Sequence, residues 1–346
     1  MKKNLRYEIV PQMKVYDQIG YKWLPFIMFT QSPNFRSKIV NTDDKGFRFN
    51  SKNQINDKTI FNLEEKDKNI LIIGGSFVFG AGSTSDENTI SGYLSNSDVN
   101  CLNLGGNAHI GFQELISIFS NINHIKNLKK IIIVSGINDF YLSNQFNINY
   151  PDLFYFNSDF ILNMNRMRIS NRKKILKFLI NIIYPNVLND ENIANLNKDN
   201  LIQFLTSTNF RQTFKEQKFL HLTLEEKLER NFKIYQILGT HFNCEVNFCL
   251  QPALIWSKQM CKEEELLFNH SNIYLKNRRA YSKTLFTKEN YEYFTKLLKN
   301  LSKKYDVKYL DINAYFNNCL VKDDWVFVDS VHCNDKGYKL VSEIFK

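Results

Sequence analysis

The chain has 346 residues, and its 45 Lys and Arg side chains against 35 Asp and Glu give it a formal net charge of +10. Its hydrophobic fraction of 43% supplies enough apolar side chains for a large core, which excludes intrinsic disorder as the main state. No apolar run is long enough to span a bilayer, and the basic N-terminus lacks the apolar stretch of a secretory signal, so we expect a cytoplasmic protein. The positive charge suggests an anionic partner, namely nucleic acid, a membrane surface or an acidic substrate.

The N-terminal part of the chain contains many aromatic side chains and several turn-forming residues, which are Pro11, Gly20, Pro25, Pro33 and Gly46. We expect residues 1–60 to wrap around a main domain that spans residues 61–346. The six cysteines are scattered through the chain without the spacing of a zinc site or a disulfide framework. Free thiols in a reducing compartment are therefore expected.

Five short apolar runs predict buried parallel strands, at residues 70–73, 99–104, 131–134, 246–250 and 307–310. The runs at 70–73 and 131–134 contain only Leu, Ile and Val, a composition typical of strands that are covered on both faces. The first two gaps between runs are each long enough for one crossover helix. The pattern predicts an α/β fold, namely a three-layer, doubly wound, flavodoxin-like five-stranded parallel sheet with a helical insertion.

Helices are predicted in the gaps between the strands. Asp86 and Glu87 favour a helix that runs to Leu94 and is capped by Ser85. Further helices are predicted over residues 113–121 and 335–345. The gap between the third and fourth strands is much longer and contains apolar residues at helical spacing near 222–238. We interpret the region 140–243 as a helical insertion rather than a separate domain.

Ligands in open α/β sheets bind at the carboxyl ends of the strands, so the residues after each strand are the candidates for a site. Ser76 follows the first strand and is preceded by Gly74 and Gly75. This stretch lacks the third glycine of a dinucleotide-binding turn and the lysine of a phosphate-binding loop. In addition, Val78 breaks the G-x-S-x-G pattern of lipases. Taken alone, the stretch indicates a structural turn.

The other strands are followed by residues that complement this serine. Glycines and Ala108 follow the second strand, and Asn138 follows the third, where its amide can donate to an oxyanion. Past the fifth strand, Asp329 and His332 are three residues apart, which can place the carboxylate beside one imidazole nitrogen. Together these residues make a complete set for acyl transfer: Ser76 as nucleophile, His332 as base, Asp329 to orient the base, and Asn138 as an oxyanion donor.

In these four places the sequence resembles the SGNH/GDSL hydrolase family. The similar segments are residues 74–80, 103–108, 136–139 and 329–332. The resemblance implies an oxyanion hole made by the backbone N–H groups of Ser76 and Ala108 and the amide of Asn138, and it implies neither a metal nor a cofactor. Two positions depart from the family, because Gly75 stands where many members carry Asp and Ala108 stands where members carry Gly. The second departure concerns rate or substrate size more than reaction class.

Residues 41–48 are similar to a segment of those SGNH proteins that are encoded with surface-polysaccharide genes. This similarity implies a bacterial serine ester hydrolase that removes an acyl group, expected to be acetyl, from a carbohydrate or a related small ester through an acyl-serine intermediate. Three alternatives remain open: an O-acyltransferase acting on a surface glycan, a lipid or lysophospholipid esterase, and a non-catalytic binding protein with the same fold.

Three further features are interpreted from the sequence. His109 is expected to be a packing or rim residue, and Asp139 is expected to fix the loop that contains Asn138. The most concentrated basic stretch lies between Arg166 and Lys177, within the insertion. It predicts either peripheral contact with an anionic membrane or a solvated helix with no partner. No nucleic-acid-binding motif is recognised, so no nucleic-acid partner is expected.

Overall fold

The computed structural model describes residues 5–24, 26–50, 59–64, 67–145, 222–274 and 283–345. The strands are β1 (Tyr21–Leu24), β2 (Met28–Gln31), β3 (Asn69–Gly74), β4 (Asn100–Gly105), β5 (Leu128–Ser135), β6 (Glu245–Leu250) and β7 (Lys308–Asp311). The longer helices are α5 (Gly111–Phe119), α6 (Ile137–Gln145), α11 (Leu224–Phe242), α13 (Lys262–Tyr274), α15 (Lys288–Tyr305), α16 (Ile312–Cys319) and α17 (Asp335–Glu343). The short helices are α1 (Leu5–Ile9), α2 (Met13–Tyr16), α3 (Ser76–Phe79), α4 (Ile90–Leu94) and α12 (Leu254–Ser257), with 3-10 turns η1 (Asp86–Asn88) and η2 (Ile122–His124).

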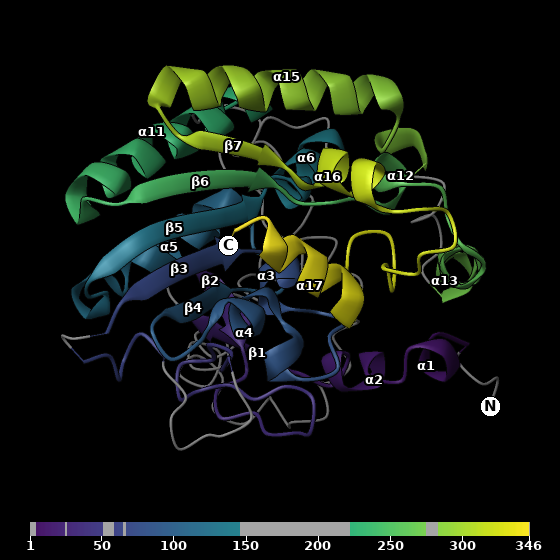
Figure 1. Ribbon diagram of the computed structural model, residues 1–346, viewed down its shortest axis with the longest axis horizontal. Helices are drawn as coiled ribbons and strands as arrows, with labels where there is room; N and C mark the ends of the chain where they lie inside the picture. The colour runs from purple at the N-terminus through teal and green to yellow at the C-terminus, as the bar shows by residue number, and fades with distance from the viewer. Residues whose placement is uncertain are drawn as a thin grey trace, which may run out of the picture. The chain divides into compact units, whose positions relative to one another are not determined.

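The five predicted strands form one sheet in the order β4-β3-β5-β6-β7, and all neighbouring pairs are parallel. The predicted fold class is confirmed: the sheet is doubly wound and lies between two layers of helices (Figure 1). Gly74 at the end of β3 is in register with Gly105 at the end of β4. Because the strands are parallel, the segments that follow each of them emerge at the same edge of the sheet.

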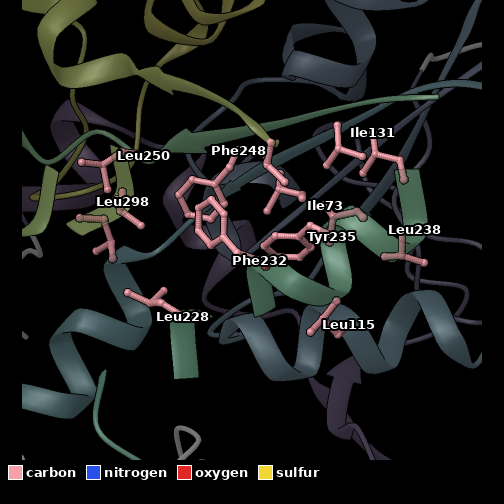
Figure 2. Close-up of a cluster of buried hydrophobic side chains, with 14 of the residues drawn as sticks. Ile73, Leu115, Ile131, Leu228, Phe232, Tyr235, Leu238, Phe248, Leu250 and Leu298 are labelled. Carbon is pink, nitrogen blue, oxygen red and sulfur yellow. The ribbon is translucent and has the colours of Figure 1, made fainter. Parts of the chain in front are cut away.

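Successive side chains of the central strands point into two different cores, as the period of a strand requires. Leu71 and Ile73 of β3 belong to the core under α5, α11 and α15, whereas Ile72 belongs to the core under α4, α16 and α17. Figure 2 shows the first of these cores, where Phe232 of α11 meets Phe248 of β6 with their ring centroids 4.8 Å apart. Both faces of the sheet are therefore covered.

Two boundaries differ from the sequence-based prediction. The helix expected from Asp86 to Leu94 is divided into η1 and α4, and Ser85 makes no capping hydrogen bond. Thr89 caps α4 instead, because its side chain accepts from the Gly92 N–H at 3.0 Å. The two pieces are separated by Thr89, whose backbone is extended, while the Asp86 side chain bonds to Asn41 and Arg48 of the N-terminal segment. Helix α5 begins at Gly111, two residues before the predicted start.

The predicted insertion is only partly described. Residues 224–242 form α11, which is capped by Thr223. This helix follows β5 and precedes β6 along the chain, and its apolar side chains pack on the sheet. Most of the remainder, including the basic stretch between Arg166 and Lys177, lies outside the described residues. In the described part of the chain, no helix is long and apolar enough to cross a membrane.

The N-terminal segment is joined to the main domain by a buried ion pair. Arg48 Nε lies 2.7 Å from Asp86 Oδ1, and the two side chains are 0% and 1% exposed. The guanidinium also donates to the carbonyls of Phe79 at 2.9 Å and Gly80 at 3.0 Å, which end the short helix α3. A third donation reaches the Ile39 carbonyl at 2.8 Å. Arg48 thus fixes the segment around residue 39 and the far end of α3 against each other.

We predict that Arg48→Met lowers the free energy of unfolding by about 3–5 kcal/mol, because it leaves the Asp86 carboxylate buried without its cation. Urea denaturation measures the change. Lys288→Met is the matched control, since Lys288 pairs with Glu292 on an exposed helix face and its side chain is 83% exposed. The control should change stability by no more than about 0.5 kcal/mol. Equal effects of the two substitutions would contradict the prediction.

Candidate active site

Ser76 is the first residue of α3, directly after the carboxyl end of β3. This position exposes its backbone N–H, because the first N–H groups of a helix have no partner within the helix. The side chain is also engaged: Ser76 Oγ lies 2.6 Å from His332 Nε2, although the two residues are 256 positions apart. The turn after the first strand is therefore more than a structural turn.

His332 is held on its other side by Asp329. His332 Nδ1 lies 2.7 Å from Asp329 Oδ2, and the two side chains are 17% and 26% exposed. The second carboxylate oxygen, Oδ1, accepts the backbone N–H groups of Val331 at 3.0 Å and His332 at 2.9 Å. The structure thus brings together the three residues that the sequence predicted for the nucleophile, the base and the orienting acid.

The surroundings of Asp329 favour its charged form. Burial by itself would raise the pKa of this carboxyl, but the adjacent His332 ring and the positive charge of Arg6 outweigh burial and hold the pKa below its ordinary value. Asp329 is therefore a carboxylate at neutral pH, where it can stabilise a protonated imidazole.

A buried glutamate supports the loop that carries this pair. Glu264 of α13 accepts at Oε1 from the backbone N–H groups of Val326 and Phe327, both at 3.0 Å. Its other oxygen accepts from Lys258 Nζ at 2.8 Å, and neither side chain is more than 3% exposed. The sequence predicted neither the support of this loop by Glu264 nor its pairing with Lys258. Glu264 lies in the acidic run 263–265, and nothing in the sequence indicates which of the three side chains is buried.

Asn138 lies beside the turn that presents Ser76. Its amide nitrogen Nδ2 donates to the His109 carbonyl at 2.7 Å. A Cβ atom added to Gly75 would stand only 2.8 Å from the same nitrogen. The absence of a side chain at residue 75 therefore allows the Asn138 amide to approach the backbone just before Ser76.

Ala108 has a backbone φ of +61°, in the left-handed region that glycine adopts most readily. Alanine is thus held here in a conformation that its Cβ disfavours. In the described part of the chain, the backbone N–H groups of Ala108 and Ser76 have no hydrogen-bond acceptor. Both donors are available for a developing negative charge.

Two buried carboxyl groups join α5, the helix that follows Ala108, to the end of β5 and to the first turn of α6, where Asn138 lies. Asp139, expected from the sequence to fix a loop at Asn138, lies in this helical turn and accepts the Gly111 N–H at Oδ2 at 2.9 Å. Ser135 Oγ donates to Glu114 Oε1 at 2.8 Å. Burial, together with the charge of Asp139, raises the pKa of Glu114 well above its ordinary value. No sequence pattern indicated Glu114, which occupies a core-facing helical position.

Among the described residues, no three His, Cys, Asp or Glu side chains gather closely enough to hold a metal ion.

His109, expected to be a packing or rim residue, is 2% exposed and therefore lies in the interior.

Comparison with known proteins places these residues in context. No family model matches the sequence, and no curated protein matches it. Among solved structures, the chain is similar to a lipase/acylhydrolase from Enterococcus faecalis, at 9% identity over 80% of this chain and 93% of the other, with a TM-score of 0.41. It is also similar to a lipolytic G-D-S-L protein from Veillonella parvula (12% identity, 80% and 94% coverage, TM-score 0.38) and to an acetyl xylan esterase (11%, 80% and 97%, TM-score 0.40). At identities this low, the chemistry of this chain has to be derived from its own side chains.

We predict that Ala108→Gly raises the free energy of unfolding by about 0.5–1 kcal/mol, because glycine relieves the left-handed backbone strain at this position. Chemical denaturation measures the change. Ala314→Gly, in the regular helix α16, is the control and should destabilise the protein by about 0.5–1 kcal/mol. A loss of stability at both positions would show that Ala108 is not strained.

Proposed function

We propose that this chain is a serine ester hydrolase that removes an acyl group, expected to be acetyl, from a carbohydrate or a related small ester. The observation that carries the proposal is the continuous hydrogen-bonded series from Ser76 Oγ through the His332 ring to Asp329. Its two distances of 2.6 and 2.7 Å are within the range for proton transfer from a serine to a histidine that a carboxylate orients.

The mechanism follows from these positions. As Ser76 Oγ attacks the ester carbonyl, His332 Nε2 takes the hydroxyl proton and Asp329 stabilises the resulting imidazolium. His332 then returns the proton to the leaving alcohol, which leaves an acyl-serine. Water, activated by the same imidazole, attacks the acyl-serine and releases the carboxylic acid and free Ser76.

Three donors surround the place where the carbonyl oxygen becomes negative. They are the backbone N–H groups of Ser76 and Ala108 and the amide of Asn138. One N–H of that amide donates to the His109 carbonyl, which orients the amide group beside Ser76. The donors are fixed before the substrate binds, so little reorganisation is needed during the reaction.

The carbohydrate part of the proposal has a separate basis, which is the similarity of residues 41–48 to SGNH proteins encoded with surface-polysaccharide genes. A panel of acetylated sugars, short nitrophenyl esters and lysophospholipids tests it. Preference for the acetylated sugars supports the proposal, and preference for lysophospholipids contradicts its carbohydrate part. Transfer of the acyl group to an added sugar, in place of release as free acid, would show an O-acyltransferase instead.

We predict that Ser76→Ala abolishes the hydrolysis of 4-nitrophenyl acetate while the protein stays folded, because no other group takes the place of the nucleophile. Initial rates and far-UV circular dichroism measure the two properties. Ser97→Ala is the control, since Ser97 is exposed and, within the part of the chain that the structure describes, its side chain bonds only to the neighbouring Asp98. Hydrolysis by the Ser76 variant at the wild-type rate would refute the proposed function.

We predict that Asn138→Ala lowers kcat by about 10²–10³-fold with little change in KM, because an oxyanion donor acts mainly in the transition state. Steady-state kinetics on the same ester measure the effect. Asn144→Ala serves as control on the same helix, where Asn144, among the described residues, bonds only to the Phe140 carbonyl one turn earlier. An unchanged kcat in Asn138→Ala would remove this amide from the oxyanion hole.

A further inference from the structure

His109 connects the oxyanion donors to the N-terminal hairpin β1–β2. It directly follows Ala108, and its main-chain carbonyl accepts the Asn138 amide at 2.7 Å. Its side chain reaches in the other direction, where Nε2 lies 2.9 Å from the carbonyl of Phe29 in β2. The imidazole and the Phe29 ring also meet edge to face, with their centroids 5.6 Å apart.

The contacts of the imidazole define its protonation state. The Phe29 carbonyl can only accept a hydrogen bond, so Nε2 carries the hydrogen and Nδ1 carries the lone pair. Nδ1 is buried and has no hydrogen-bond partner among the described residues. It lies against Gly106, where an added Cβ would overlap the ring. Burial lowers the pKa of His109 to about 4, so the ring is neutral at pH 7. It therefore acts as a fixed donor rather than as a proton carrier.

The hairpin that receives this hydrogen bond is strained. Phe26 and Met28 have φ angles of +67° and +71°, in the region that bulky residues rarely adopt. The carbonyls of the two alternate residues, Ile27 and Phe29, are both bound from outside the hairpin. Gln113 Nε2 donates to Ile27 at 2.8 Å, and His109 donates to Phe29. A strained conformation persists only where its surroundings hold it, and these two side chains supply that restraint.

We propose that His109 is a positioning residue whose neutral imidazole ties the strained hairpin to the oxyanion donors Ala108 and Asn138. The inference rests on the proposed function, because the donors matter only if an oxyanion forms. One residue, through its side chain and its carbonyl, fixes the hairpin on one side and the Asn138 amide on the other. Loss of the side-chain bond frees the backbone at residues 108–109, and both donors then lose their alignment.

Two substitutions separate the hydrogen bond from simple packing. His109→Gln retains an amide N–H near the place of Nε2, whereas His109→Phe fills the space without a donor and leaves the Phe29 carbonyl unpaired. With 4-nitrophenyl acetate, we expect His109→Phe to lower kcat by about 10–100-fold with KM nearly unchanged, since small displacements of aligned groups cost rates of that order. His109→Gln should recover most of the loss.

A stability measurement tests the neutral, buried ring without reference to activity. The folded-state pKa of about 4 lies below the ordinary value of 6.5, so the unfolded chain binds a proton first as the pH falls. The stability due to the neutral ring is complete above pH 6.5, falls between pH 6.5 and 4, and levels off below that. The free energy of unfolding of the wild type should therefore fall more steeply across this interval than that of His109→Gln.

The Ser76 and His109 variants distinguish a failure of the positioning role of His109 from a failure of the proposed ester hydrolase function. Wild-type hydrolysis that survives in Ser76→Ala would refute the proposed function, whatever the His109 variants do. With that function intact, a wild-type kcat in folded His109→Phe would overturn the inference, as would a His109→Gln variant as slow as His109→Phe. If His109→Phe does not fold, His109→Asn replaces it, because its shorter amide does not reach Phe29. The same loss of kcat is then expected, and a wild-type kcat again overturns the inference.

Discussion

The buried pair of Arg48 and Asp86 is the constraint on which the position of Ser76 depends. A guanidinium without solvent is stable only if its donors are satisfied, and here they bind a carboxylate and three backbone carbonyls. Two of those carbonyls belong to the last turn of α3, whose first residue is Ser76, so a positive charge stands at the helix end that favours it. The N-terminal segment is thereby part of the scaffold of the site.

Buried polar side chains also fix the other segments of the site. Glu264 with Lys258 holds the loop of Asp329 and His332, while Asp139 and Glu114 join α5 to the first turn of α6 and the end of β5. Each of these segments is fixed by a buried polar group whose partners are mostly backbone N–H groups or hydroxyls. Buried groups of this kind are costly when broken and specific when complete, so they fix loops that apolar packing alone would leave free to shift.

The sequence predicted what depends on local composition and chain order. Short apolar runs identified the five strands, two of them as continuous Ile, Leu and Val, and the residues that follow strands identified Ser76, Asn138, Asp329 and His332. It did not predict the partnership of Arg48 with Asp86, because two charged residues 38 positions apart leave no periodic signal. It also placed the helix cap at Ser85, whereas the backbone is extended again at Thr89 and the Thr89 side chain caps α4. The sequence could not predict that Ala108 adopts a left-handed backbone conformation, because alanine disfavours that conformation.

The separation of Ser76 from His332 along the chain has a consequence for folding. The serine is synthesised 256 residues before the imidazole that it contacts, and the late segment is joined to the early one again where Tyr338 donates to the Ala81 carbonyl at 2.7 Å. Contacts of such long range form late, because they require the greatest loss of chain entropy. During translation, therefore, the nascent polypeptide carries an unactivated hydroxyl until the segment around α17 has left the ribosome and docked.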